Sequence, residues 1–189
     1  MSRRIRREAE KLRKADVKRR YLAGARARID APGVGERILR LLVDDLSITP
    51  EERARSRIQL TLLLLSRLDG EALELLQSNL EDPEVKGRSR RDSRKLLELQ
   101  ESLQQLHELA TAVSSGGIER SVASGQLAVA LRVHDPARAE RLLRDALLEP
   151  ELPEEWRQHL ESELSDLEEG RWQAERQAFR DEIDRPGYF

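Results

Sequence analysis

Residues 58–68 restrict the fold of this chain more than any other segment. The run reads IQLTLLLLSRL, and its apolar side chains point in every direction around a helix: Ile58, Leu60, Leu62, Leu63, Leu64, Leu65 and Leu68. A helix that is apolar on all sides has to be covered on all sides. Because the run lies between Arg57 and Arg67 and falls short of the roughly 20 apolar residues that a bilayer requires, it predicts a core helix and not a membrane span.

The composition indicates that the helices covering this segment belong to an all-α fold. Leu, Ala, Glu, Arg and Gln dominate, and all of them favour helices. Aromatic residues are only 3% of the chain, so Leu, Ala, Val and Ile must form the core. No stretch shows the sustained alternation, rich in Val, Ile or Thr, that is typical of strands. We therefore predict a multi-helix bundle or a short helical-repeat array with a basic N-terminal helix.

Prolines, glycines and capping residues divide the chain into helices. Thr49-Pro50-Glu51-Glu52 is the clearest start, because it combines an N-cap hydroxyl, a proline at the first helical position and a glutamate three residues after the cap. The expected helices cover about 2–29, 34–46, 50–68, 71–80, 90–115, 118–133, 136–148, 153–168 and 171–185. With Ser114-Ser115-Gly116-Gly117 as a linker, we predict a basic arm at 1–30, a helical core at 34–115 and an acidic helical unit at 118–189.

An internal repeat is visible when Pro50 is aligned with Pro83. Arg55-Ser56-Arg57 then falls on Arg88-Ser89-Arg90, and Leu63-Leu64 falls on Leu96-Leu97. The segment ALELLQSNLEDPEVKGRSRRDSRKLLEL, residues 72–99, resembles a HEAT-type helical repeat, with a leucine-rich helix, an Asp-Pro-x-Val turn and a second helix that begins with a basic residue. The resemblance covers residues 38–103 and implies two stacked helix pairs; a plain helical bundle is the alternative.

No catalytic or metal-binding motif accompanies these helices. The chain has no cysteine, which excludes disulfides, thiolate nucleophiles and cysteine metal sites. His107-Glu108 begins like a zinc-protease motif, but Thr111 stands where the second histidine is required. Gly33-Val34-Gly35 lacks the residues that complete a nucleotide-binding loop. We predict a protein that is not an enzyme and holds no metal or cofactor. Because no apolar stretch follows the basic N-terminus before residue 34, we expect it in the cytoplasm.

Charge is distributed unevenly along the chain. Residues 1–28 carry twelve Lys or Arg against three acidic residues, whereas residues 140–184 carry fifteen Asp or Glu against six Arg. The apolar positions of the first segment make only a narrow, broken stripe, so we expect most of its surface to face water or an anionic partner, and we expect the fold to survive deletion of residues 2–20. The predicted nucleic-acid-binding residues are Arg3, Arg4, Arg6, Arg7, Lys11, Arg13, Lys14, Lys18, Arg19 and Arg20. Alternatively, the basic segment pairs with the acidic one.

Protein contacts are predicted on two further surfaces. Leu96, Leu99, Leu103 and Leu106 follow the 3, 4 spacing of a helix-pairing seam, and Trp156 and Trp172 lie on apolar helix faces near the C-terminus. We therefore expect a non-enzymatic scaffold or adaptor that binds nucleic acid, or a ribonucleoprotein, through the backbone phosphates with weak sequence preference. Its helical body is expected to assemble with a protein partner or a second copy, and no membrane is involved. The alternative is a protein–protein interaction module of helical-repeat type that binds no nucleic acid.

Overall fold

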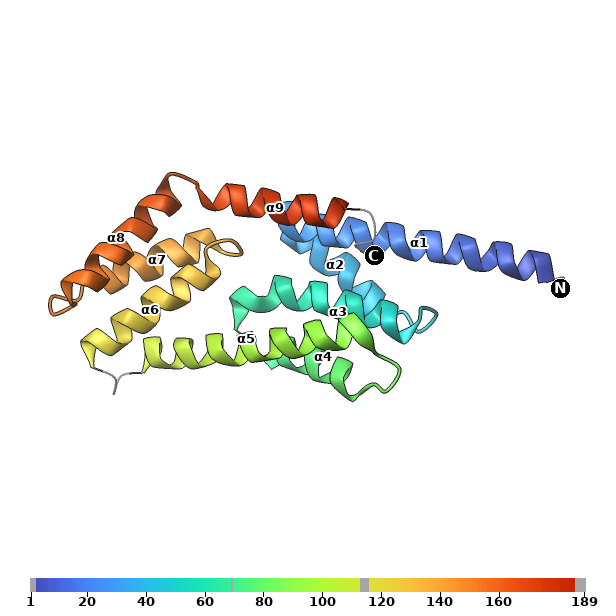
Figure 1. Cartoon of the computed structure of the whole chain (residues 1–189), viewed down its shortest axis with the longest axis horizontal. Coiled ribbons are helices and arrows are strands. Elements are labelled where there is room, and N and C mark those ends of the chain that lie inside the picture. The colour runs from blue at the N-terminus through green and yellow to red at the C-terminus, as the bar shows by residue number, and fades with distance from the viewer. Residues whose placement is uncertain (1–2, 69, 113–115, 186–189) are drawn as a thin grey trace. The chain divides into compact units, whose positions relative to one another are not determined.

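The computed structural model describes residues 3–68, 70–112 and 116–185, and every regular element within these ranges is a helix (Figure 1). This confirms the predicted all-α fold. The elements are α1 (Arg3–Asp30), α2 (Pro32–Val43), α3 (Pro50–Leu64), the 3-10 turn η1 (Leu65–Arg67), α4 (Gly70–Glu81), α5 (Gly87–Thr111), α6 (Gly117–Leu131), α7 (Pro136–Leu147), α8 (Glu154–Glu168) and α9 (Trp172–Asp184). Within these ranges no helix has the length and hydrophobicity needed to span a membrane.

The helices form two compact units. Unit 1 contains Met1–Leu63, Glu71–Lys95 and Arg180–Phe189, and unit 2 contains Leu64–Gly70 and Leu96–Phe179. Unit 1 thus includes α1, α2, nearly all of α3, most of α4 and the beginning of α5. The end of α9 joins it, where Ile183 packs with Ala25 and Ile29 of α1. Unit 2 is built mainly from the second part of α5, from α6, α7 and α8, and from most of α9.

The second half of α1 is a core element of unit 1. Val17 and Tyr21 are buried together with Leu42 and Ile48. The narrow apolar stripe that suggested a solvated arm is therefore sufficient to attach the helix, since its residues fall on one side of α1. Gly35 of α2 allows the close approach of the two helices, because a Cβ atom there would lie 2.5 Å from the backbone nitrogen of Arg28. Among residues 2–20, Val17 is a buried position of this core, and a deletion of the segment would remove it.

The buried hydrophobic cluster of unit 2 is aliphatic. Its buried cluster is formed by α6, α7, α8 and the loop between α7 and α8: Ala128, Ala139, Leu143, Ala146, Leu152, Leu160 and Leu167. Trp156 and Trp172 are partly buried and pack against this cluster. Gly125 of α6 meets α8 closely, since a Cβ atom there would lie 2.4 Å from a methyl group of Leu160.

The leucine-rich core helix starts as predicted, but α3 ends at Leu64 and the 3-10 turn η1 continues to Arg67, instead of one helix to residue 68. Ile58, Leu60, Leu64, Leu65 and Leu68 are buried, whereas Leu62 and Leu63 are partly exposed. At the start of α3, the hydroxyl of Thr49 accepts a hydrogen bond from the Glu52 backbone N–H (3.2 Å), and the Glu52 carboxylate accepts one from the Thr49 backbone N–H (2.8 Å). This is a capping box, in which each residue satisfies the backbone donor of the other.

Three helical hairpins, α2–α3, α4–α5 and α7–α8, share one type of turn. Each turn begins with an acidic residue whose carboxylate accepts the backbone N–H two residues later and whose carbonyl accepts the N–H three residues later. The acidic residues are Asp45, Asp82 and Glu149, and the third residues, all buried, are Ile48, Val85 and Leu152. A side-chain acceptor of this kind fixes a short turn locally. The same turn therefore forms three times from different sequences.

The helices of these hairpins bury equivalent positions. Ten residues before the acidic residue lies a small one (Gly35, Ala72 or Ala139), and four residues later a leucine (Leu39, Leu76 or Leu143). An arginine eight residues after the acidic residue (Arg53, Arg90 or Arg157) donates to backbone carbonyls of the turn or of the preceding helix end. Equivalent positions of the first two hairpins thus lie 37 residues apart, not the 33 obtained by aligning Pro50 with Pro83, because Pro50 begins α3 whereas Pro83 lies in a turn.

The connection before α7 also repeats the one before α2. Ala31 and Asp135 hold nearly identical N-cap dihedrals (φ −145°, ψ 72° and φ −144°, ψ 75°), and Pro32 and Pro136 follow as first helical residues. Each N-cap backbone N–H donates to the carbonyl four residues earlier, with Ala27 and Leu131 as acceptors. The three-helix sequence α1–α2–α3 of unit 1 therefore has the same local connections as α6–α7–α8 of unit 2.

Candidate nucleic-acid interface

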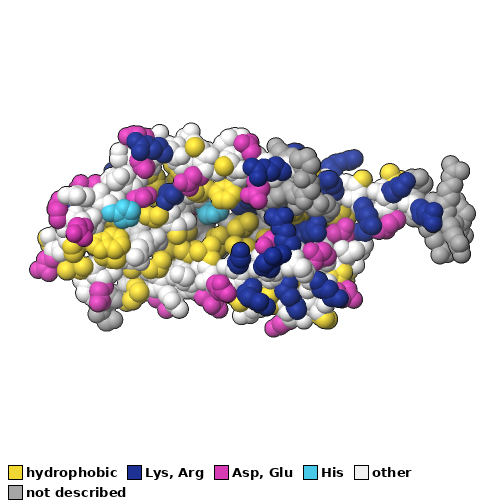
Figure 2. All heavy atoms as spheres, in the orientation of Figure 1, with side chains coloured by type: hydrophobic (Ala, Val, Ile, Leu, Met, Phe, Trp, Pro, Cys, Tyr) yellow, Lys and Arg dark blue, Asp and Glu magenta, His cyan; other side chains and the backbone are white. Residues whose placement is uncertain are grey.

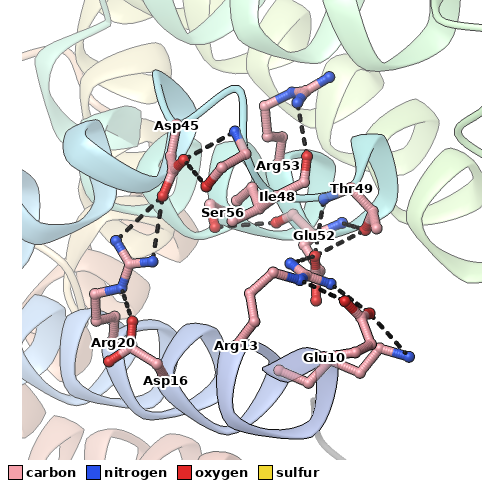
Figure 3. Close-up of polar contacts among 12 residues, drawn as sticks. Glu10, Arg13, Asp16, Arg20, Asp45, Ile48, Thr49, Glu52, Arg53 and Ser56 are labelled. Carbon is pink, nitrogen blue, oxygen red and sulfur yellow. Dashed lines mark hydrogen bonds and ion pairs between the residues drawn. The ribbon is translucent and has the colours of Figure 1, made fainter. Parts of the chain in front are cut away.

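Two arginines of α1 attach this helix to the rest of unit 1. Arg13 donates to Glu52 at the start of α3 (3.2 Å) and to Glu10 on its own helix (3.0 Å). Arg20 donates to Asp45 in the turn between α2 and α3 (3.2 Å), as Figure 3 shows. Because carboxylates of the same chain bind these guanidinium groups, the contacts of Arg13 and Arg20 stabilise the packing of unit 1. The sequence alone did not separate them from the other cations of α1.

The electrostatic effect of these contacts is seen in the acidic partners. Burial raises the pKa of Glu52, but hydrogen bonds from Thr49 and Arg13 outweigh it, so the pKa lies below its ordinary value. The Ser47 hydroxyl and backbone N–H, followed by Arg20, lower the pKa of Asp45. Both carboxylates therefore stay ionised at neutral pH and complete a polar contact inside unit 1.

A second group of α1 cations faces solvent. Arg7, Lys11, Lys14, Lys18 and Arg19 are exposed. Lys14 lies 3.5 Å from Glu10, with both side chains about half exposed or more, which is a weak contact in water. Among the described residues, no ion pair involves Arg7, Lys18 or Arg19. The side chains of Arg3, Arg4 and Arg6 lie outside the part of the chain whose side chains the structure describes.

The first turn of α3 links α1 to the beginning of α5. While Glu52 binds Arg13 of α1, the neighbouring Glu51 accepts a hydrogen bond from the Ser89 hydroxyl of α5 and one from the Lys86 backbone N–H (3.4 Å). Both glutamates of this turn are thus used in packing within unit 1. Their carboxylates accept hydrogen bonds from Arg13, Ser89 and the Lys86 backbone within unit 1.

The beginning of α5 carries a cluster of cations that the sequence analysis did not assign to a site. Lys86, Arg91, Arg94 and Lys95 are exposed, and none of them forms an ion pair within the described part of the chain. Figure 2 shows Lys and Arg side chains gathered over this region and along α1 on one face of unit 1. The signal was present as the charge density of residues 86–95, but only the structure separates exposed cations from Arg90, which binds the carbonyls of Leu80 and Asp82.

The six predicted protein-contact residues have different environments. Leu103 is buried and Leu99 is 43% exposed, while Leu96 and Leu106 lie between these extremes. The 3, 4 spacing on α5 is therefore not one evenly buried face. Trp156 and Trp172 contribute part of their surface to the core of unit 2. A contact of these residues with another protein stays a prediction.

Comparison with protein-family models, with curated proteins and with solved structures found no match to this chain. The exposed cations of unit 1 are the structural feature that bears on function.

Proposed function

We propose that this chain is a non-enzymatic helical scaffold that binds nucleic acid through the exposed cations of α1 and assembles with protein through its helical body. The observation that carries the proposal is that the α1 cations fall into two groups, one bound by carboxylates of unit 1 and one exposed to solvent. Arg13 and Arg20 are used in packing, whereas Arg7, Lys18 and Arg19 project without an ion pair among the described residues. A fold-stabilising role accounts for the first pair and not for the second group.

The chemistry of this group fits the phosphate backbone. Ammonium and guanidinium groups neutralise phosphates and release condensed counterions, which favours binding without reading the bases. Tyr21 is the only aromatic residue of α1 and is buried, so it offers no ring for base stacking. The buried side of α1 also argues against membrane binding, because an interfacial helix must present an apolar face to lipid. Weak sequence preference is therefore expected.

The test is the salt dependence of binding to a labelled duplex. We expect the logarithm of the association constant to fall with a slope of about −4 against the logarithm of salt concentration, at roughly −0.9 per phosphate contact. Lys18→Gln with Arg19→Gln should reduce the slope by about 2. The matched control is Arg120→Gln with Arg141→Gln, which removes two exposed cations from unit 2.

Deletion of residues 2–20 is unsuitable for this test, because it removes Val17 from the core together with Arg13 and Arg20. Two results decide against nucleic-acid binding: no binding to DNA or RNA at low salt, or an effect of the unit 2 control equal to that of the α1 variant.

A second candidate function is protein binding by a helical-repeat surface without nucleic acid. It is favoured by the threefold recurrence of the hairpin turn, since stacked helical hairpins of HEAT type build extended protein-binding surfaces. Purification of bound partners with and without nuclease separates the two functions. Partners retained equally after nuclease treatment support the second candidate, and partners lost with the nucleic acid support the first.

A further inference from the structure

The exposed cations at the start of α5 are not required by the hairpin in which they lie. The hairpin α7–α8 has the same turn and the same arginine contacts, so its residues show what the geometry needs. Where α4–α5 has Lys86, Arg91, Arg94 and Lys95, the equivalent positions of α7–α8 are Pro153, Gln158, Glu161 and Ser162. The same turn and the same arginine contacts are thus formed without any of these four charges.

Arg90, unlike these four cations, has an equivalent arginine in the hairpin α7–α8. It donates to the carbonyls of Leu80 and Asp82, and its equivalent Arg157 donates to those of Leu147 (3.1 Å) and Glu149 (2.8 Å). A structural arginine is therefore kept at the same place in both hairpins. Cations present in only one of them, and exposed there, need an explanation outside the hairpin.

The first turn of α3 contacts both α1 and the start of α5. Glu52 and Glu51 are consecutive residues of α3, and the first binds Arg13 of α1 while the second binds Ser89 of α5. The same helical turn of α3 thus contacts α1 and the start of α5, each by one side chain. Figure 2 shows their cations on the same face of unit 1.

We infer that the start of α5, through Lys86, Arg91, Arg94 and Lys95, is a second phosphate-contacting surface that engages the same nucleic acid as α1. This inference rests on the proposed function and extends it from one helix to a two-helix surface. Along α5, Arg91, Arg94 and Lys95 follow i, i+3, i+4 spacing, which places their side chains on one side of the helix. Such a row neutralises consecutive phosphates of a backbone that passes along it.

The composition of this segment selects nucleic acid over a lipid surface. Residues 86–95, KGRSRRDSRK, contain no large apolar side chain, so they have nothing to insert into a bilayer. Asp92 is the one acidic residue among them and lies 3.3 Å from Arg88, which is itself 64% exposed. An acidic protein segment would meet the same cations, and the test includes it as a separate arm.

The experiment compares three variants of the whole 189-residue chain, each of which removes two charges. Arg91→Gln with Arg94→Gln changes α5, Lys18→Gln with Arg19→Gln changes α1, and Arg120→Gln with Arg141→Gln is the control in unit 2. Binding of labelled duplex DNA, duplex RNA, polyglutamate and anionic vesicles is measured over a range of salt concentrations. We expect the α5 variant to lower the slope for a nucleic-acid duplex by about 2, at roughly 0.9 per phosphate.

Each outcome has one meaning. If the unchanged protein binds neither duplex, the proposed function fails, and this inference fails with it. If it binds and the α5 variant behaves like the unit 2 control, the inference alone is overturned. Binding of polyglutamate or vesicles as tight as duplex binding, with equal loss in the α5 variant, also overturns it. A difference between the DNA and RNA arms identifies the source of the phosphates.

Two measurements separate lost contacts from lost structure. The α5 variant should melt like the unchanged protein, because its two arginines form no ion pair among the described residues. Arg91→Lys with Arg94→Lys keeps both charges and should restore the salt slope. A melting transition lowered by the glutamine changes and not restored by the lysine changes would assign these arginines to folding and overturn the inference.

Discussion

The hairpins α4–α5 and α7–α8 have the same turn but bury different side chains. Asn79, Ser93 and Gln100 are fully buried in the first, and the equivalent positions in the second are Ala146, Leu160 and Leu167, which are also buried. The Asn79 amide donates to the Ala54 carbonyl (3.1 Å) and to the Ser93 hydroxyl (3.0 Å). The hairpin therefore accommodates either a polar or an aliphatic interior. Asn79 and Ser93 are hydrogen-bonded to each other, whereas the buried Gln100 amide has no hydrogen-bond partner among the described residues.

This difference shows which positions specify the hairpin. Those that coincide are the acidic residue of the turn, the buried residue that ends it, the leucine of the first helix and the arginine that binds backbone carbonyls. The polarity of the buried residues and the charge of the exposed residues differ between the hairpins α4–α5 and α7–α8. The turn and the arginine contacts are the same in both hairpins, but the exposed residues at the start of the second helix differ. The cations of α5 are therefore not required for folding of the hairpin, as expected of residues with a role outside folding.

The largest expected effect tests whether the two hairpins depend equally on their shared leucine. Leu76 and Leu143 occupy equivalent positions and are both buried. Leu76→Ala and Leu143→Ala should each lower the free energy of unfolding by about 2–5 kcal/mol, because each leaves a cavity in a packed interior. Urea denaturation gives the total loss, and hydrogen exchange shows which helices open. A near-neutral result for either variant would mean that the two positions are not equivalent.

The second prediction concerns the arginine that binds backbone carbonyls. Arg90→Ala and Arg157→Ala should each cost about 1.5–3 kcal/mol, the range for hydrogen bonds to a charged group. The neighbouring Arg91→Ala and Gln158→Ala are matched controls, since both side chains are exposed and should stay within about 0.5 kcal/mol. If an arginine variant is as stable as its control, that arginine does not contribute to the stability of the hairpin.

A third prediction uses the difference between the two interiors. Asn79→Ala makes the first hairpin resemble the second at this position, yet it should cost about 1–3 kcal/mol, because the Ser93 hydroxyl and the Ala54 carbonyl lose a buried partner. The double variant Asn79→Ala with Ser93→Ala should lose less than the two single changes together. Strict additivity would show that Asn79 and Ser93 do not interact energetically.

Helix positions were predictable because their signals are local. The capping box of Thr49 and Glu52 is formed as expected, and Asp135 caps α7 through the Arg138 backbone N–H (3.0 Å). The burial of most of the leucine-rich run likewise follows from its own apolar surface. These features depend on residues a few positions apart, so a single sequence contains the information.

Properties that depend on distant partners were not predictable. Arg13 and Arg20 look like their neighbours in the sequence, and only their contacts with Glu52 and Asp45 give them a structural role. The spacing of the repeat was obscured because Pro50 begins a helix and Pro83 lies in a turn. The cations of α5 were visible as a basic stretch, but their exposure needed the structure.

The smallest expected effect concerns pH and the contacts of α1 with the α2–α3 hairpin. The Asp45 carboxylate accepts from Ser47 and Arg20, and the Glu52 carboxylate accepts from Thr49 and Arg13; each pKa lies below its ordinary value. A carboxyl group whose pKa is lower in the folded than in the unfolded protein stabilises the fold fully above the unfolded pKa, about 4, and loses this contribution as pH falls through the folded pKa. Stability should therefore decline below about pH 4.

Asp45→Asn with Glu52→Gln removes both titrating groups and should flatten this part of the profile while lowering stability at pH 7. Urea denaturation at intervals between pH 6 and pH 2.5 measures the slope for the variant and for the unchanged protein. The control is Glu155→Gln with Glu161→Gln, which neutralises two exposed carboxylates of α8 and should leave the slope nearly unchanged. If the control flattens the acid profile as much as the Asp45 and Glu52 changes do, acid sensitivity arises from general charge repulsion. The contacts between α1 and the α2–α3 hairpin would then contribute nothing measurable to acid sensitivity.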